Sequence, residues 1–116
     1  MSFDAVTAVL EDIRRNLELI IEFTEATDRE QFEVEYKTQY AVIRALEIAG
    51  EAVKRVPPEV CERDPKVPWK AMAGMRDRLI HAYDNINVDI VWNTARITVP
   101  DVLSRIEALL ADSHDS

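Results

Sequence analysis

The scarcity of helix-breaking residues constrains this chain more than any other feature of its sequence. Its 116 residues include two glycines, and its five prolines are confined to positions 57, 58, 65, 68 and 100. In the long segments between these breakers, apolar residues recur at the three- and four-residue spacing of one helix face. We therefore expect an all-α fold, an antiparallel up-and-down bundle of four or five helices.

The first half of the chain contains two long apolar stripes. The first extends to Ile21, and Ser2 or Asp4 can cap the start of its helix. A brief helix through Phe32 leads to a second long helix over 36–56, which ends where two prolines follow. The apolar stripe of this second helix consists of Tyr36, Tyr40, Ile43, Leu46, Ala49, Gly50 and Val53.

The second half begins with a proline-containing segment over 57–68, which we expect to be an irregular link. A helix over 69–83 follows, and Asn87 can cap a further helix through Ile97. Thr98 is positioned to cap a last helix, with proline in its first turn and an acid three residues after the threonine. The inner face predicted for the helix over 69–83 consists of Met72, Met75, Leu79 and Ala82.

Length and composition indicate one domain over 1–116, because two halves of this chain would each have too thin a core. The polar residues 112–116 are expected to form a frayed tail. No apolar run approaches the roughly 20 residues that cross a bilayer, and no export signal is visible, so we expect a cytoplasmic protein without a membrane span. The single cysteine, Cys61, suits a reducing compartment, and the neighbouring Glu59 and Glu62 disfavour its thiolate.

The charge of the chain is acidic but unevenly distributed. Twenty-two acidic and fourteen basic residues give a net charge of −8, which disfavours a protein that coats nucleic acid irrespective of sequence. The segment 63–81 contains five basic and two acidic residues, so it has a charge of +3 and the remainder −11. This pattern fits a small phosphate-handling site.

Most catalytic constellations are excluded by the residues present. The chain has two histidines, His81 and one in the tail, and neither stands three residues after a glutamate, so a carboxylate-bridged di-metal site is excluded. No glycine-rich phosphate loop and no serine nucleophile motif occur. Glu47 and Glu51 could bind a cation, but the simpler interpretation is helix ion pairs with Arg44 or Arg55. We expect neither a metal nor a cofactor.

The segment 76–83 is the strongest candidate site. Arg76, Asp77, His81 and Tyr83 are side-chain types of hydrolytic or nucleotide-handling sites, and they gather near the end of one helix in the cationic segment. Asp77 and His81 are four residues apart, so the carboxylate can fix the imidazole tautomer and raise its basicity. The alternative interpretation is a histidine that stabilises a helix C-terminus beside surface arginines.

The spacing of Arg76 and His81 predicts a dimer. Five residues separate them by about 140° around the helix and by about 7.5 Å along it, so one helix aims them in different directions. A two-fold dimer that packs this helix against its copy would bring an arginine and a histidine from each chain into one cleft.

At these residues the chain resembles the HepT-like toxins of the HEPN superfamily. The Arg-Asp-x-x-x-His-x-Tyr pattern at 76–83 is preceded by Trp-x-x-Met-x-x-Met at 69–75 and followed by Val-Asp and Trp within 88–92. With the segment Val-Ile-Arg-Ala-Leu-Glu-Ile-Ala-Gly-Glu-Ala at 42–52, the resemblance covers nearly the whole chain, to Leu110.

The resemblance implies a homodimeric, metal-independent ribonuclease, the toxin of a toxin–antitoxin pair whose antitoxin is an MntA-like nucleotidyltransferase. By position, Arg76 and His81 would be the catalytic pair, supported by Asp77 and Arg78, and Tyr83 the hydroxyl that receives AMP from the antitoxin. Asparagine is frequent at the position of Asp77, and an aspartate there lowers the local positive potential.

The residue types also allow a mechanism. The two His81 side chains of a dimer can serve as base and acid while Arg76 binds the phosphate, so that RNA cleavage leaves a 2′,3′-cyclic phosphate and a 5′-hydroxyl. Single-stranded or looped RNA is the expected substrate. One alternative is a non-catalytic dimer that binds nucleotide and accepts AMP from a nucleotidyltransferase; another is a purely structural bundle.

Overall fold

The computed structural model describes the backbone of residues 2–81 and 87–115 and, within them, all side chains except those of 76, 79–81 and 113–115. No strand occurs in these ranges, which confirms the predicted all-α class. In chain order the elements are α1 (Phe3–Glu25), α2 (Arg29–Val34), α3 (Tyr36–Val53), α4 (Pro58–Cys61), α5 (Trp69–His81), α6 (Val88–Asn93), the π-helical turn η1 (Thr94–Thr98) and α7 (Val99–Asp115).

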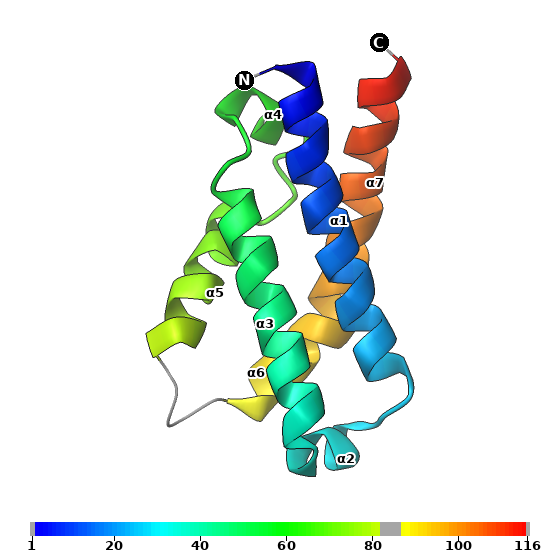
Figure 1. The fold of residues 1–116 in the computed structure, drawn as a ribbon, viewed down its shortest axis with the longest axis vertical. Helices are drawn as coiled ribbons and strands as arrows, with labels where there is room; N and C mark the ends of the chain where they lie inside the picture. The colour runs from blue at the N-terminus through cyan, green and yellow to red at the C-terminus, as the bar shows by residue number, and fades with distance from the viewer. Residues whose placement is uncertain (1, 82–86, 116) are drawn as a thin grey trace.

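Four longer helices form the up-and-down bundle that the sequence predicts. In Figure 1, α1 and α5 run downward and α3 and α7 run upward, so the two ends of the chain lie at the same end of the bundle. α1 packs against both α3 and α7, whereas α5 packs mainly against α3. None of the described helices combines the length and the apolarity needed to cross a membrane.

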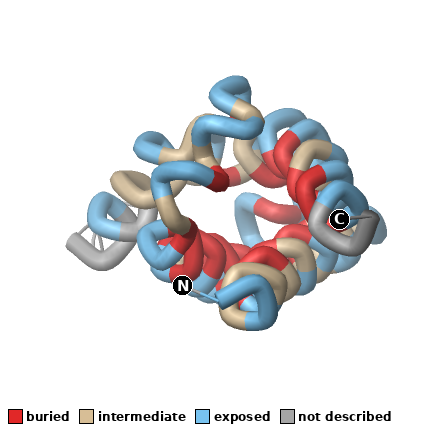
Figure 2. The backbone as a smooth tube through the Cα atoms, turned by 90° about the horizontal axis from the view of Figure 1, so that it is seen from above, coloured by how far each residue is buried: buried red, intermediate tan, exposed pale blue. Residues whose placement is uncertain are grey.

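The core lies along the facing sides of α1, α3 and α7. In Figure 2 the buried positions line the inside of the bundle and the exposed positions lie outside. Each fully buried aliphatic side chain contributes about 1.5–3 kcal/mol relative to leaving it in water. The largest fully buried side chains on the long helices are Leu10, Ile13, Leu17, Ile20, Val42, Val102 and Ile106.

Two predicted helix starts are confirmed by side-chain caps. The Ser2 hydroxyl accepts a hydrogen bond from the Ala5 amide at 3.2 Å, and the Asn87 side chain accepts one from the Ile90 amide at 3.2 Å. The brief helix through Phe32 is α2, whose Phe32 side chain is fully buried. Such caps stabilise a helix by about 1 kcal/mol each.

The inner face predicted for the start of α3 is wrong. Tyr36 and Tyr40 are 69% and 67% exposed, and Gln39 is buried instead. The Gln39 amide nitrogen donates hydrogen bonds to the carbonyl oxygens of Phe32 at 2.8 Å and Glu33 at 2.9 Å. This polar contact satisfies backbone groups at the end of α2 and turns both tyrosines outward.

Two boundaries also differ from the prediction. The link over 57–68 contains the short helix α4, and Thr98 does not begin a new helix, because α6, η1 and α7 follow one another without a break. The Val99 amide bonds to the carbonyl of Thr94, five residues earlier. Pro100 lacks an amide hydrogen for the usual four-residue bond, and the wider π turn accommodates it.

Candidate active site

A hydrogen-bonded cluster around Asp64 fixes the start of α5. The Asp64 carboxylate accepts hydrogen bonds from the Lys66 amide at 3.1 Å and from the Arg105 guanidinium of α7 at 3.2 and 3.3 Å. The bond to Asp64, more than a second one to Asp101, raises the pKa of the Arg105 guanidinium. The Asp64 carbonyl accepts a hydrogen bond from the Trp69 indole at 3.1 Å, so the first residue of α5 is tied to the link before it.

The last turns of α5 contain the predicted catalytic pair. The backbone of α5 includes both Arg76 and His81, but their side chains lie outside the described residues, as does all of Tyr83. The convergence of guanidinium and imidazole groups therefore remains a prediction from the helix spacing.

The Asp77 carboxylate is described, and it has a partner on another helix. The Lys54 ammonium at the end of α3 lies 3.1 Å from Asp77 and 4.0 Å from Glu51. Lys54 thus ties the middle of α5 to α3 and compensates part of the negative charge that Asp77 brings to the site. The predicted contact of Asp77 with the His81 ring remains untested.

Two cations on α5 have no acidic partner within the described part of the chain. Lys70 and Arg78 are both exposed, and no ion pair links either of them to a described carboxylate. By contrast, Arg14, Arg29 and Arg44 pair with nearby carboxylates. Lys70 and Arg78 therefore give α5 a local positive potential that an anionic ligand could use.

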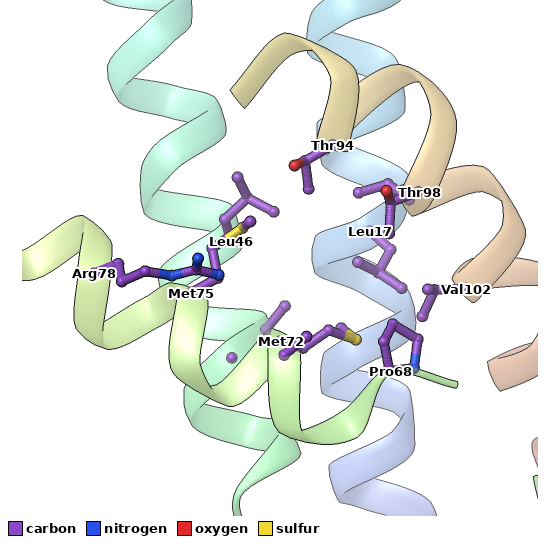
Figure 3. A pocket seen from close by; sticks show the side chains of 13 residues that line it. Leu17, Leu46, Pro68, Met72, Met75, Arg78, Thr94, Thr98 and Val102 are labelled. Carbon is purple, nitrogen blue, oxygen red and sulfur yellow. The ribbon is translucent and has the colours of Figure 1, made fainter. Parts of the chain in front are cut away.

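A cavity of about 200 Å³ lies between α5 and the rest of the bundle. Figure 3 shows Met72, Met75 and Arg78 of α5 on one side of it and Thr94 and Thr98 of η1 on the other. The remaining lining residues are Leu17, Leu46, Ala49, Gly50, Pro68, Ala71, Val99 and Val102. The cavity is mainly apolar, with one guanidinium and two hydroxyl groups at its polar positions.

Other candidate groups have structural roles. Glu47 pairs with Arg44 at 3.3 Å, as the ion-pair interpretation predicts, and Glu51 lies 4.0 Å from Lys54, a partner that the prediction did not name. Burial is the main cause that raises the pKa of the Cys61 thiol, and its acidic neighbours add to it. Among the described side chains, no group of three or more His, Cys, Asp or Glu residues could hold a metal ion.

The sequence interpretation missed two features of the site. The contact of Lys54 with Asp77 joins positions 23 residues apart, and no spacing rule predicts such a pair. Thr98 was interpreted only as a helix cap and Thr94 was not singled out, although both line the cavity. Pro100, two residues beyond a threonine pair at four-residue spacing, was the available signal for the π turn.

Comparison with known proteins gives consistent results. The family described as "Ribonuclease HepT-like" matches residues 13–109. A protein of Thermococcus cleftensis named "Probable ribonuclease HepT" is 47% identical over 100 residues, covering 86% of this chain and 91% of that protein. A Methanocaldococcus jannaschii protein named "Putative RNase MJ0127" is 45% identical over 107 residues, covering 92% of this chain and 88% of its own length. No solved structure matches at a comparable level of significance.

Proposed function

This chain belongs to the HepT-like ribonuclease family, and we propose that it is a metal-independent RNA endonuclease that acts as the toxin of a toxin–antitoxin pair. The observation on which the proposal rests is the family match over 13–109, which includes the Arg76 and His81 spacing on α5. Lys70 and Arg78 on the same helix, which have no acidic partner among the described residues, support it, because RNA needs a local cationic surface on an acidic protein.

The proposed reaction is an internal transesterification. One His81 removes the proton of a ribose 2′-hydroxyl, and the 2′-oxygen attacks the adjacent phosphorus. The bond from phosphorus to the 5′-oxygen breaks, and a second, protonated His81 donates its proton to the departing oxygen. The Arg76 guanidinium binds the phosphate oxygens bidentately and stabilises the added negative charge. The products are a 2′,3′-cyclic phosphate and a 5′-hydroxyl.

The reaction requires two subunits in this proposal. Positions 76 and 81 are separated by about 140° around an ideal helix, so in this proposal each cleft takes groups from both copies of α5. α5 suits this role because it packs mainly against α3, and several described residues on its outer face are exposed.

Tyr83 is the proposed point of control. A cognate nucleotidyltransferase would transfer AMP from ATP to the Tyr83 hydroxyl and release pyrophosphate. The attached phosphodiester would place a bulky anion two residues beyond His81, where it repels RNA and competes for Arg76. A Tyr83→Phe variant should retain cleavage and lose the mass increase caused by AMP after incubation with the nucleotidyltransferase and ATP.

The direct test is cleavage of end-labelled single-stranded RNA by the purified protein in the presence of EDTA. We expect fragments with cyclic phosphate ends, and we expect His81→Ala and Arg76→Ala each to reduce the rate by about 100-fold or more. Arg15→Ala removes an exposed arginine of α1 and serves as the matched control, with an unchanged rate.

The outcomes separate the candidate functions. Equal cleavage by the wild type and both active-site variants would indicate a contaminant and reject the nuclease. Absence of cleavage by a dimeric wild type that still accepts AMP at Tyr83 would instead favour the non-catalytic partner of a nucleotidyltransferase. Size-exclusion chromatography with light scattering establishes that each variant remains a dimer.

A further inference from the structure

We propose that the cavity between α5 and η1 is a nucleobase pocket, which binds one base of the RNA substrate next to the scissile phosphate. This inference rests on the proposed ribonuclease function and adds a determinant of cleavage-site preference. The residues that define the pocket are Met72, Met75, Arg78, Thr94 and Thr98.

The cavity is accessible from the surface beside the catalytic helix. Ala71, Arg78 and Thr98 line it and are exposed, so the cavity opens between α5 and η1. Figure 3 shows the Arg78 side chain extending past Met75 toward the cavity. Arg78 precedes His81 by three residues, about 4.5 Å along the helix axis, so a base in the pocket lies within reach of the proposed cleavage chemistry.

The size of the cavity fits one heteroaromatic ring. Its volume of about 200 Å³ exceeds the roughly 150 Å³ of an engineered apolar cavity that binds benzene. The thioether side chains of Met72 and Met75 form one wall and can adapt to either face of a planar ring. Leu17, Leu46 and Val102 are among the other apolar residues of the lining.

The polar groups of the cavity fit the edge and the phosphate of a nucleotide. Neither Thr94 nor Thr98 has a hydrogen-bond partner for its hydroxyl among the residues that the structure describes, and each hydroxyl can donate to or accept from a base edge. Both threonines lie on the π-helical turn, a rare geometry that occurs frequently at functional sites. Arg78, which has no described acidic partner, can bind the adjacent phosphate.

Methionine methyl NMR tests the pocket directly. The chain has three methionines, and two of them, Met72 and Met75, line the cavity, while Met1 serves as an internal control. We expect nucleoside 5′-monophosphates and short RNA oligonucleotides to shift the signals of Met72 and Met75 but not that of Met1. Ribose 5-phosphate, which has no base, should leave all three unchanged.

Two variants connect binding with cleavage. Ala71→Leu fills the mouth of the cavity from an exposed position and should weaken nucleotide affinity by about tenfold, or 1.4 kcal/mol. Ala111→Leu, at an exposed position of α7 outside the cavity lining, is the matched control. Thr98→Val keeps the shape of the side chain and removes the hydroxyl. On a randomised RNA, Ala71→Leu and Thr98→Val should both alter the base preferred beside the cleaved bond, as read by sequencing of product ends.

The results distinguish this inference from the proposed function. If the wild type cleaves RNA while no nucleotide or oligonucleotide shifts Met72 or Met75, and the variants keep the wild-type base preference, the nucleobase pocket is wrong and the ribonuclease stands. If the methyl signals of Met72 and Met75 move with protein concentration and not with nucleotide, a second copy of the chain occupies the cavity, which also overturns the inference.

If no RNA is cleaved at all, the proposed function fails, and the methyl titration still decides whether the cavity binds a base. Free mononucleotide binding without any effect on cleavage preference would overturn the assignment to RNA.

Discussion

At the scale of single residues, the Thr7 hydroxyl on α1 is buried without a hydrogen-bond partner among the described residues. An unsatisfied buried hydroxyl costs about 1–3 kcal/mol, so Thr7→Val, which keeps the branched shape, should raise the free energy of unfolding by about 1 kcal/mol. Urea denaturation followed by circular dichroism measures the change.

The matched control is Thr24→Val. The Thr24 hydroxyl is buried, donates to the Ile20 carbonyl at 2.9 Å and accepts from the Arg96 guanidinium at 3.2 Å. Loss of the hydroxyl removes a buried hydrogen bond to the Ile20 carbonyl and one to the exposed Arg96, so this variant should destabilise the protein by about 1 kcal/mol. Equal effects of the two substitutions would contradict the assigned hydrogen bonding.

The Cys61 thiol gives a prediction with a pH dependence. Burial raises its pKa, and the negative charges of Glu59 and Glu62 raise it further, so the folded state holds the thiol proton more tightly than the unfolded state. Stability from this group is therefore present below the unfolded pKa and is lost as the pH rises through the folded pKa. Iodoacetamide at pH 8 should modify Cys61 about tenfold more slowly in the folded protein than in urea, as measured by mass spectrometry. Equal rates in the two states would contradict the burial.

Local sequence rules predicted the role of a single residue correctly where an interaction with a near neighbour in sequence determines that role. The caps at Ser2 and Asn87 followed from side chains that bond three residues ahead. The exposed position of Tyr40 could not be predicted in this way. It depends on Gln39, which donates hydrogen bonds to carbonyls six and seven residues earlier, and the spacing of apolar residues gives no information about such contacts between two helices.

At the scale of helices, Gly74 is unexplained by the single chain. A Cβ atom at this position would meet no neighbour within 4 Å, although glycine destabilises a helix interior by about 0.5–1 kcal/mol relative to alanine. Gly74 lies one turn from both Lys70 and Arg78 and two turns from His81. Gly74→Ala should therefore stabilise the isolated fold by that amount and reduce RNA cleavage, because a methyl group would then project from the face that we propose approaches a second copy or RNA. Thermal unfolding and cleavage rates of the same preparation measure both effects.

Ser104→Ala is the control for Gly74→Ala. Ser104 is an exposed position of α7, and alanine there also favours the helix. We expect a similar gain in stability with full activity. If Gly74→Ala behaves in the same way, the face of α5 that contains Gly74 has no role in catalysis.

The helices themselves were largely predictable, and their junctions were not. Apolar spacing reports which residues face a core, so it placed α1, α3, α5 and α7 within a few residues of their observed bounds. Apolar spacing does not show which carbonyl each amide bonds to. The sequence therefore predicted a new helix start at Thr98, whereas α6, η1 and α7 form one continuous helical segment.

At the scale of the whole molecule, the charge distribution predicts a weak dependence on salt. With a net charge of −8, attraction to RNA should come from the few cations of α5 and its surroundings that have no acidic partner in the described part of the chain. If about two to four phosphates are contacted, log affinity should fall against log salt with a slope of about −1.4 to −2.8 for single-stranded RNA.

Lys70→Ala tests the source of this salt dependence. Removal of one phosphate contact should reduce the slope by about 0.7 and leave the chemistry of the product ends unchanged. Lys37→Ala, at an exposed lysine near the start of α3, is the matched control and should keep the wild-type slope. Fluorescence anisotropy of a labelled RNA over a salt series measures this slope. A slope steeper than about −5 would indicate an extended nucleic-acid-binding surface instead.

The antiparallel bundle could be predicted from the sequence, but the arrangement that leaves a cavity could not. Helix lengths and short connections favour an up-and-down order. The separation of α5 from η1 and α7 depends on tertiary contacts, such as Lys54 with Asp77 and Arg105 with Asp64, that join distant positions. The chemistry of 76–83 was visible in the residue types, whereas the proposed convergence of these groups in a second subunit's cleft cannot be read from residue types or spacing alone.

Subunit mixing tests the shared active site most directly. Wild-type protein and His81→Ala are coexpressed at equal levels, so that random pairing makes about one quarter of the dimers wild type in both subunits. If each cleft uses both His81 side chains, as we propose, RNA cleavage should fall to about one quarter of the wild-type rate per dimer and should vary with the square of the wild-type fraction. A rate of about one half, falling linearly with that fraction, would show that each cleft needs only one His81 side chain and would contradict the proposed use of two.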